Sequence, residues 1–187
     1  HAIVTITNTI FQNHGTTRSP KQLPNAVSTG TGFIGMWGKG GALHIRGNSQ
    51  IIIKNTKVVF TNNILTAPPK SALGQADKRQ YFGGSIFMMD SSIVIDNSEL
   101  IIEKSSSTYM GGGMYMLGGS MTLQNHAKVH ITKNNAYSMG GGMMIDTIES
   151  QKNVVISIDS QSSFELDENS CTFGSGMYIV GLSYIGP

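Results

Sequence analysis

The chain has 187 residues, of which only 13% are charged, and its formal net charge is +2. So small a charge gives no electrostatic footprint for nucleic acid. No apolar run approaches the ~18 residues of a membrane span, and the single cysteine excludes an intrachain disulfide and a cysteine-based zinc site. Because 39% of the residues are hydrophobic, the composition favours one folded domain over residues 1–187.

The N-terminal residues predict two short strands, followed by an insertion over about residues 14–39. The strands lie in Ile6-Thr7-Asn8 and Ile10-Phe11-Gln12-Asn13, and the same pattern, an apolar strand that ends in Asn, recurs along the chain. The chain begins without Met and without a signal-peptide pattern. We therefore expect a processed chain or a fragment.

From residue 40 onward, glycine doublets or triplets introduce apolar segments, which we name openers. Their first glycines are 43, 28, 29 and 34 residues apart. The short intervals indicate a repeat of about 28 residues, and the longest indicates a second insertion over about residues 64–82, in which residues 71–79 carry the only helix signal. Glycine permits a positive φ and a close approach of backbones, so we expect these residues at corners. The openers are Gly40-Gly41-Ala42-Leu43-His44-Ile45, Gly83-Gly84-Ser85-Ile86-Phe87-Met88, Gly111-Gly112-Gly113-Met114-Tyr115-Met116, Gly140-Gly141-Gly142-Met143-Met144-Ile145 and Gly174-Ser175-Gly176-Met177-Tyr178-Ile179, and the predicted corner glycines are Gly41, Gly84, Gly112, Gly141 and Gly174.

Two further blocks follow the openers. The second block is a short alternating strand that ends in a polar residue, usually Asn, and the third has an apolar residue three positions before a polar one. Asn tolerates left-handed backbone and bonds to neighbouring backbone groups, and stacked amides bond to one another. We therefore predict a structural ladder, with a ligand site as the alternative. The predicted Asn ladder comprises Asn8, Asn55, Asn97 and Asn125, and a second corner column comprises Asn63, Ser105, Asn134 and Asn169.

The repeat predicts an all-β fold without hairpins. Each unit contains three short strands rich in Ile, Val and Met with a period of two, and the sequence has no Asn-Gly hairpin turn. Three strands in so short a repeat suit a parallel β-helix, whose coils stack ~4.8 Å apart and align equivalent residues in columns. We predict a right-handed parallel β-helix (a solenoid) of about five rungs, with three strands per rung and two long loop insertions.

Alternate residues of the openers form inward and outward columns. The columns that begin with Leu43 and with Ile45 are wholly apolar in every opener, so we expect them inside. The column between them is expected to face outward. It would form a continuous apolar stripe ~20 Å long, which is larger than the isolated apolar residues of an ordinary protein surface. A partner-protein contact, sugar stacking on its tyrosines and cover by the insertions are the alternatives. The outward stripe comprises Phe87, Tyr115, Met144 and Tyr178, after His44.

Two of these segments resemble the paired motifs of a known family. Gly40-Gly41-Ala42-Leu43, followed by Phe60-Thr61-Asn62-Asn63, resembles the GGA[ILV] and FxxN motifs of chlamydial polymorphic membrane proteins. In the other repeats Gly or Ser replaces Ala, and Ile or Leu replaces Phe; looser versions resemble the β-helix proteins of the pectin-lyase-like superfamily. The resemblance implies a right-handed parallel β-helix at the cell surface or outside the cell, serving adhesion as the passenger of an autotransporter.

A carbohydrate-active β-helix enzyme, a polysaccharide lyase or hydrolase, is the main alternative, and its chemistry needs clustered carboxylates. Asp96 and Asp159 occupy equivalent repeat positions two rungs apart, roughly 10 Å, which is near the upper limit for an inverting pair; we expect solvated corner residues instead. His126 and His130 would need a third metal ligand, and Cys171 has no neighbouring basic residue in sequence to activate it. We therefore expect no catalytic residue, no metal and no cofactor, and the sequence favours a non-enzyme without excluding an enzyme.

The two ends of the chain are predicted to be complementary and open. The chain begins with the second and third strands of a rung and ends with the first strand, in the Met177 opener. Uncapped coil ends expose unpaired strand edges, and a head-to-tail contact that does not close yields a fibre. We predict an extracellular structural or adhesive protein whose partner is another copy or another surface protein, with a glycan as a further option; an adhesin passenger fragment of a longer surface protein is the alternative.

Overall fold

The computed structural model describes residues 2–12, 15–16, 27–29, 40–65, 81–148, 150, 152–181 and 183–186. Within these ranges the chain forms strands joined by turns, and the strands pair in parallel. Most of both predicted insertions, including the helix signal at residues 71–79, lies outside the described residues. No described segment forms an apolar helix long enough to cross a membrane.

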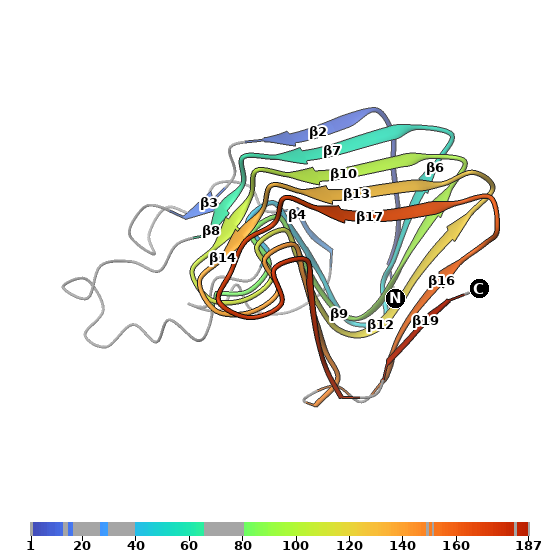
Figure 1. Ribbon diagram of the computed structural model, residues 1–187. Coiled ribbons are helices and arrows are strands. Elements are labelled where there is room, and N and C mark those ends of the chain that lie inside the picture. The colour runs from blue at the N-terminus through green and yellow to red at the C-terminus, as the bar shows by residue number, and fades with distance from the viewer. Residues whose placement is uncertain are drawn as a thin grey trace.

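The largest sheet has two arms joined by bent strands (Figure 1). Its main path is β1-β6-β9-β12-β15-β18, with β4 and β5 on one arm and β16 and β19 on the other. The long strands β9 and β12 bend in the middle, so each contributes to both arms. The strands are β1 (Ile3–Ile6), β4 (Val27–Thr29), β5 (Leu43–Ile45), β6 (Gln50–Lys54), β9 (Ile86–Asp96), β12 (Met114–Gln124), β15 (Met143–Asp146), β16 (Val154–Ile158), β18 (Met177–Val180) and β19 (Ser183–Gly186).

Two smaller sheets enclose the interior together with the first. The five-stranded sheet, in the order β17-β13-β10-β7-β2, lies across the top of Figure 1, and the four-stranded sheet β14-β11-β8-β3 lies at its left end. We call one pass of the chain through these sheets a layer. Stacked parallel layers fit a β-solenoid. The strands are β2 (Thr9–Gln12), β3 (Gly15–Thr16), β7 (Lys57–Thr61), β8 (Ile64–Leu65), β10 (Glu99–Glu103), β11 (Ser106–Ser107), β13 (Lys128–Thr132), β14 (Asn135–Ala136) and β17 (Ser163–Asp167).

Side chains alternate between the interior and the surface along each strand, as the period of two predicts. In β10, Leu100 and Ile102 are buried while their neighbours are half-buried. The inner layers bury these residues in one continuous apolar cluster, and removal of this surface from water stabilises the stack. The two predicted inward columns are in register residue by residue: Leu43, Ile86, Met114, Met143 and Met177, and Ile45, Met88, Met116, Ile145 and Ile179.

The openers contain two glycine columns with different physical roles. The first column has a left-handed backbone, with φ between 62° and 71° at Gly40, Gly83, Gly111, Gly140 and Gly174. The second column is needed for space, because a Cβ on Gly84 would lie 2.0 Å from the carbonyl oxygen of Gly112 in the next layer. Gly174 therefore does not align with the other predicted corner glycines, and Ser175 stands at their position in the last opener.

The end of the chain differs from the prediction. β19 pairs with β16 after β18 has paired with β15. The chain therefore ends on a second strand rather than on a first, and the predicted complementarity of the half-rungs is wrong, because β19 fills the place expected for the N-terminal strand of another copy. The sequence pattern missed β19 because Ser183-Tyr184-Ile185-Gly186 lacks the polar residue, usually Asn, that ends the other second blocks.

Candidate functional site

The outward stripe is buried rather than exposed over most of its length. Phe87, Tyr115 and Met144 are only 1%, 4% and 1% exposed, and Tyr178 is half-buried. They form a second apolar cluster, outside the strands that face the main interior. The prediction that this stripe is an accessible partner surface is therefore wrong for its first three members.

Among the described residues, the adjacent corner covers this stripe; the alternative of cover by the insertions falls mostly on residues outside the described ranges. The ring of Phe82 lies 4.7 Å from that of Tyr115, centroid to centroid, and 6.5 Å from that of Phe87. Met110 and Met139 pack against the same cluster. Each covering residue directly precedes the first glycine of an opener, so the left-handed glycine folds the preceding side chain back over the strand that follows.

The predicted Asn ladder turns the chain at the end of the second block. Its four members have φ between 43° and 56°, which is the left-handed region that Asn tolerates. The Asn97 amide donates to Oδ1 of Asn55 at 2.9 Å, whereas Asn8 accepts from the Thr56 hydroxyl at 2.8 Å. The Asn125 amide donates to the Asp96 carboxylate at 2.7 Å. The amides are therefore engaged in bonds between layers.

The second corner column forms a buried polar ladder. Asn63 and Asn134 are buried, and the Asn134 Oδ1 accepts from the Ser105 backbone N–H at 2.9 Å. Asn169 Oδ1 accepts from the Asn134 backbone N–H at 2.9 Å in the same way. Each side chain thereby satisfies a backbone donor of the preceding layer, which would be costly to leave unpaired.

The two candidate carboxylates are bound into one corner. Asn125 contacts both, since its side-chain amide donates to Asp96 and its backbone N–H donates to Asp159 Oδ2 at 2.7 Å. Bonds from Asn125 and Lys54 lower the pKa of Asp96, and bonds from the Ser162 side chain and the Asn125 backbone lower the pKa of Asp159. A general acid needs a raised pKa, so this arrangement suits structural carboxylates that remain ionised.

The remaining sequence candidates lie apart from one another. His130 contacts carboxylates rather than His126: its Nδ1 lies 2.7 Å from Glu165 Oε2, and its Nε2 lies 3.9 Å from Glu99 Oε1. The Cys171 thiol donates to the Phe173 carbonyl at 2.8 Å. Within the described ranges no three His, Cys, Asp or Glu side chains gather as a metal site would require.

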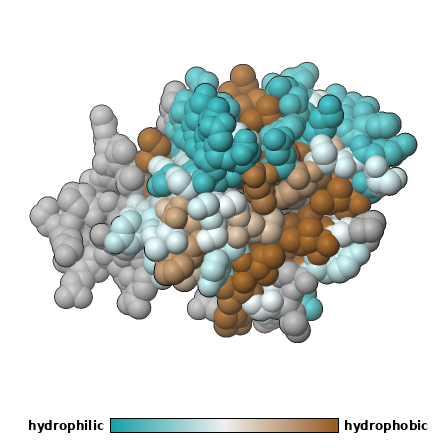
Figure 2. Space-filling model, in the orientation of Figure 1, coloured by the Kyte–Doolittle hydropathy of each residue, from teal (hydrophilic) through white to brown (hydrophobic). Residues whose placement is uncertain are grey.

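Apolar side chains from inward columns are exposed on the end of the stack formed by β17, β18 and β19, which we name the end face. These C-terminal strands lie nearest the viewer in Figure 1, and hydrophobic residues spread across the middle and lower part of the same view in Figure 2, below a hydrophilic upper edge. Ile179 and Ile185, from inward columns, are 45% and 41% exposed. Phe164, Leu166 and Met177 are only partly buried there.

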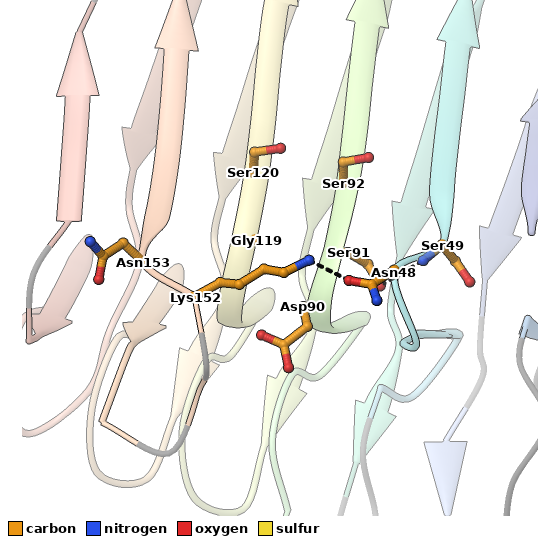
Figure 3. Close-up of a pocket in the computed structure, with 9 residues that line it drawn as sticks. All are labelled: Asn48, Ser49, Asp90, Ser91, Ser92, Gly119, Ser120, Lys152 and Asn153. Atoms are coloured by element: carbon orange, nitrogen blue, oxygen red, sulfur yellow. Dashed lines mark hydrogen bonds between the residues drawn. The ribbon is translucent and has the colours of Figure 1, made fainter. Parts of the chain in front are cut away.

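A polar hollow of about 290 Å³, which we name the saddle, lies where the two arms of the large sheet meet (Figure 3). It exists because the corners differ in length: residues 89–91 and 117–119 form tight corners, flanked by longer ones at 46–49 and 146–154. Asn48 and Lys152 rise on the two sides, with Asp90 and Gly119 between them. The Lys152 ammonium donates to Asn48 Oδ1 across the hollow.

Sequence reasoning missed the saddle, although the sequence contained a signal for it. The segment between the last inward residue of an opener and the second block varies in length between repeats. It is short from Met88 to Ser92 and long from Ile145 to Val155. A long corner next to short ones must project and leave a hollow beside it.

Comparison of the chain with protein-family models, with curated proteins and with solved structures finds no match.

Proposed function

We propose that the chain is a non-enzymatic structural or adhesive protein of the cell surface or exterior. In this proposal it is a right-handed parallel β-helix of about five rungs, with three main strands per rung, whose end face pairs with a further layer of strands. The motifs that resemble those of chlamydial polymorphic membrane proteins support the location and the adhesive role. A passenger segment of a longer surface protein is the other form of the same proposal.

The observation that carries the proposal is the loss of cover on inward columns at the end face. In the inner layers Met88 and Met116 are fully buried, whereas Ile179 at the same column position is 45% exposed. Ile185 is similarly open at the end of the column that contains Ile156. Apolar surface of this kind is stabilised by a covering layer. Among the described strands, β17 and β19 each pair with one neighbour, so their other edges are the place for parallel pairing with a further layer.

The geometry also limits how a further layer pairs. A Cβ at Gly41, Gly84 or Gly112 would meet the carbonyl oxygen of the next layer at 2.0–2.2 Å. Ser175 stands at this position in the last opener, so its Cβ obstructs an identical glycine corner on top of it. The incoming layer therefore pairs along β17 and β19 and departs from the repeat beside Ser175.

The test is the concentration dependence of particle size. Sedimentation velocity and electron microscopy of the purified chain should show particles that lengthen with concentration, and Ile185→Lys should reduce association, because a buried ammonium at the end face is strongly disfavoured. Tyr137→Lys is the matched control, since Tyr137 is exposed and does not belong to β17, β18 or β19. A strictly monomeric profile of the unmodified chain would contradict the stacking proposal.

A further inference from the structure

We propose that the saddle binds a neutral saccharide, as a site separate from the end face. The proposal rests on the arrangement of four polar groups: the Asp90 carboxylate, the Lys152 ammonium and the hydroxyls of Ser92 and Ser120. It does not depend on stacking of the end face, because the saddle lies on the side of the stack.

The two charged groups face the hollow without neutralising each other. Lys152 donates to Asn48, and Asp90 Oδ1 accepts from the Ser150 hydroxyl at 2.6 Å. Among the described residues no ion pair of 4 Å or less joins Lys152 to Asp90. A strong acceptor and a strong donor are therefore presented to the same space.

The floor of the saddle adds two hydroxyls at regular spacing. Ser92 and Ser120 are direct neighbours in the register of β9 and β12, and both are half-buried. None of the described residues forms a hydrogen bond with either hydroxyl. In Figure 3 they lie on the strands just beyond Asp90 and Gly119.

The Asp90 carboxylate is positioned by the backbone conformation of Asp90 and by the Ser150 hydroxyl. Asp90 has φ 49°, a left-handed conformation that Asp tolerates. A Cβ on Gly118 would lie 1.9 Å from the Ser150 hydroxyl and 2.5 Å from Asp90 Oδ1. Glycine at this position therefore allows the projecting loop to approach and fix the carboxylate through Ser150.

A sugar hydroxyl matches this set because it donates and accepts at once. One hydroxyl can donate to Asp90 while it accepts from Lys152, and its neighbours can exchange bonds with Ser92 and Ser120. A simple anion is opposed by the carboxylate, and a cation is opposed by the ammonium. The volume of about 290 Å³ is at the lower end for small-molecule sites and suits one or two sugar rings.

The experiment is a titration of the whole chain with maltose, cellobiose, lactose and chitobiose, followed by amide chemical shifts. At least one disaccharide should give saturable shifts at Gly118, Gly119 and Ser120. Asp90→Asn should weaken this binding about tenfold or more, because charge-assisted bonds are the stronger ones. Asn also tolerates the left-handed backbone and keeps an acceptor for Ser150, so this variant leaves the corner intact.

Two matched controls make the outcomes decisive. Glu165→Gln removes a carboxylate on the five-stranded sheet and should leave binding unchanged, as should Ile185→Lys on the end face. Ser120→Ala should weaken binding with an unchanged fold by circular dichroism. No saturable shift with any of the four sugars, equal loss in Glu165→Gln, or tighter binding of inorganic phosphate or Ca²⁺ than of every sugar would each overturn the proposal.

Discussion

The inner layers and the end face contain the same columns in different surroundings. Ile145 and Ile179 pair directly and are 0% and 45% exposed. β15 has partners on both sides, whereas β18 has one among the described residues. Burial in this stack is therefore set by the neighbouring layer rather than by residue type, and equivalent substitutions should have unequal effects in the two regions.

The largest difference is expected at the glycine corner. Gly112→Ser installs in an inner layer the residue that the last opener has at Ser175, and its Cβ would lie 2.2 Å from the Gly141 carbonyl oxygen and 2.4 Å from backbone atoms of Asn135. Because backbone must move, we expect a loss of about 4 kcal/mol or more in the free energy of unfolding. Urea unfolding measures it, and Ser175→Gly, the reverse change at the end, should alter stability by less than about 1 kcal/mol.

Truncation within one column should give the next largest contrast. Ile145→Ala leaves a cavity between two packed layers and should cost about 3 kcal/mol. Ile179→Ala removes a side chain that is already half open to solvent and should cost about 1 kcal/mol. Thermal unfolding of both variants measures the contrast in dilute, unassociated protein. Equal costs would contradict the view that the neighbouring layer sets the contribution of a column position to stability.

The buried polar ladder offers a smaller contrast of the same kind. Asn134→Ala removes the acceptor for the Ser105 N–H and the donor to the Ile102 carbonyl, both inside the stack. We expect it to lower the free energy of unfolding by about 2 kcal/mol. Asn169→Ala, one layer nearer the end, removes the acceptor for the Asn134 N–H and the donor to the Ile131 carbonyl. Asn169 itself is half-buried rather than buried, so water can replace these bonds more readily and we expect a smaller loss. Urea midpoints at equal slope would measure both.

The smallest effect is expected in acid. The pKa of Asp159 lies below its ordinary value of 3.8, chiefly because of the Ser162 hydroxyl and the Asn125 N–H. Its ionised form therefore stabilises the fold above about pH 4, and this contribution is lost as the pH falls through 3.8 towards the folded value. Asp159→Asn should show a weaker pH dependence of unfolding over this range. An unchanged pH dependence would show that these bonds do not lower the pKa of Asp159 in the folded state relative to the unfolded state.

The columns could be predicted from sequence because they depend on a period of two and a repeated opener. Leu43, Ile86 and Met114 lie in the predicted register, since each strand places alternate side chains on one face. The fate of the outward stripe could not be predicted in this way. Parity shows that Tyr115 faces away from the main interior, but only the path of the corner shows that Phe82 folds over it.

The saddle and the last strand were missed for a related physical reason. Both depend on segments between the regular blocks, where the sequence has no period to follow. Asp90 and Lys152 are far apart along the chain and unremarkable by type, and only the stacking of short and long corners brings them to one hollow.

The unequal corners at the saddle have a consequence for protein engineering. Met116 pairs with Ile145 and Ser120 pairs with Val155, although the connecting segment grows from residues 117–119 to residues 146–154. The ladders on both sides thus keep their alignment although the segments between them differ in length. A foreign peptide grafted between residues 146 and 154 would be displayed at a fixed point beside the stack, without a change in the spacing or order of the strands.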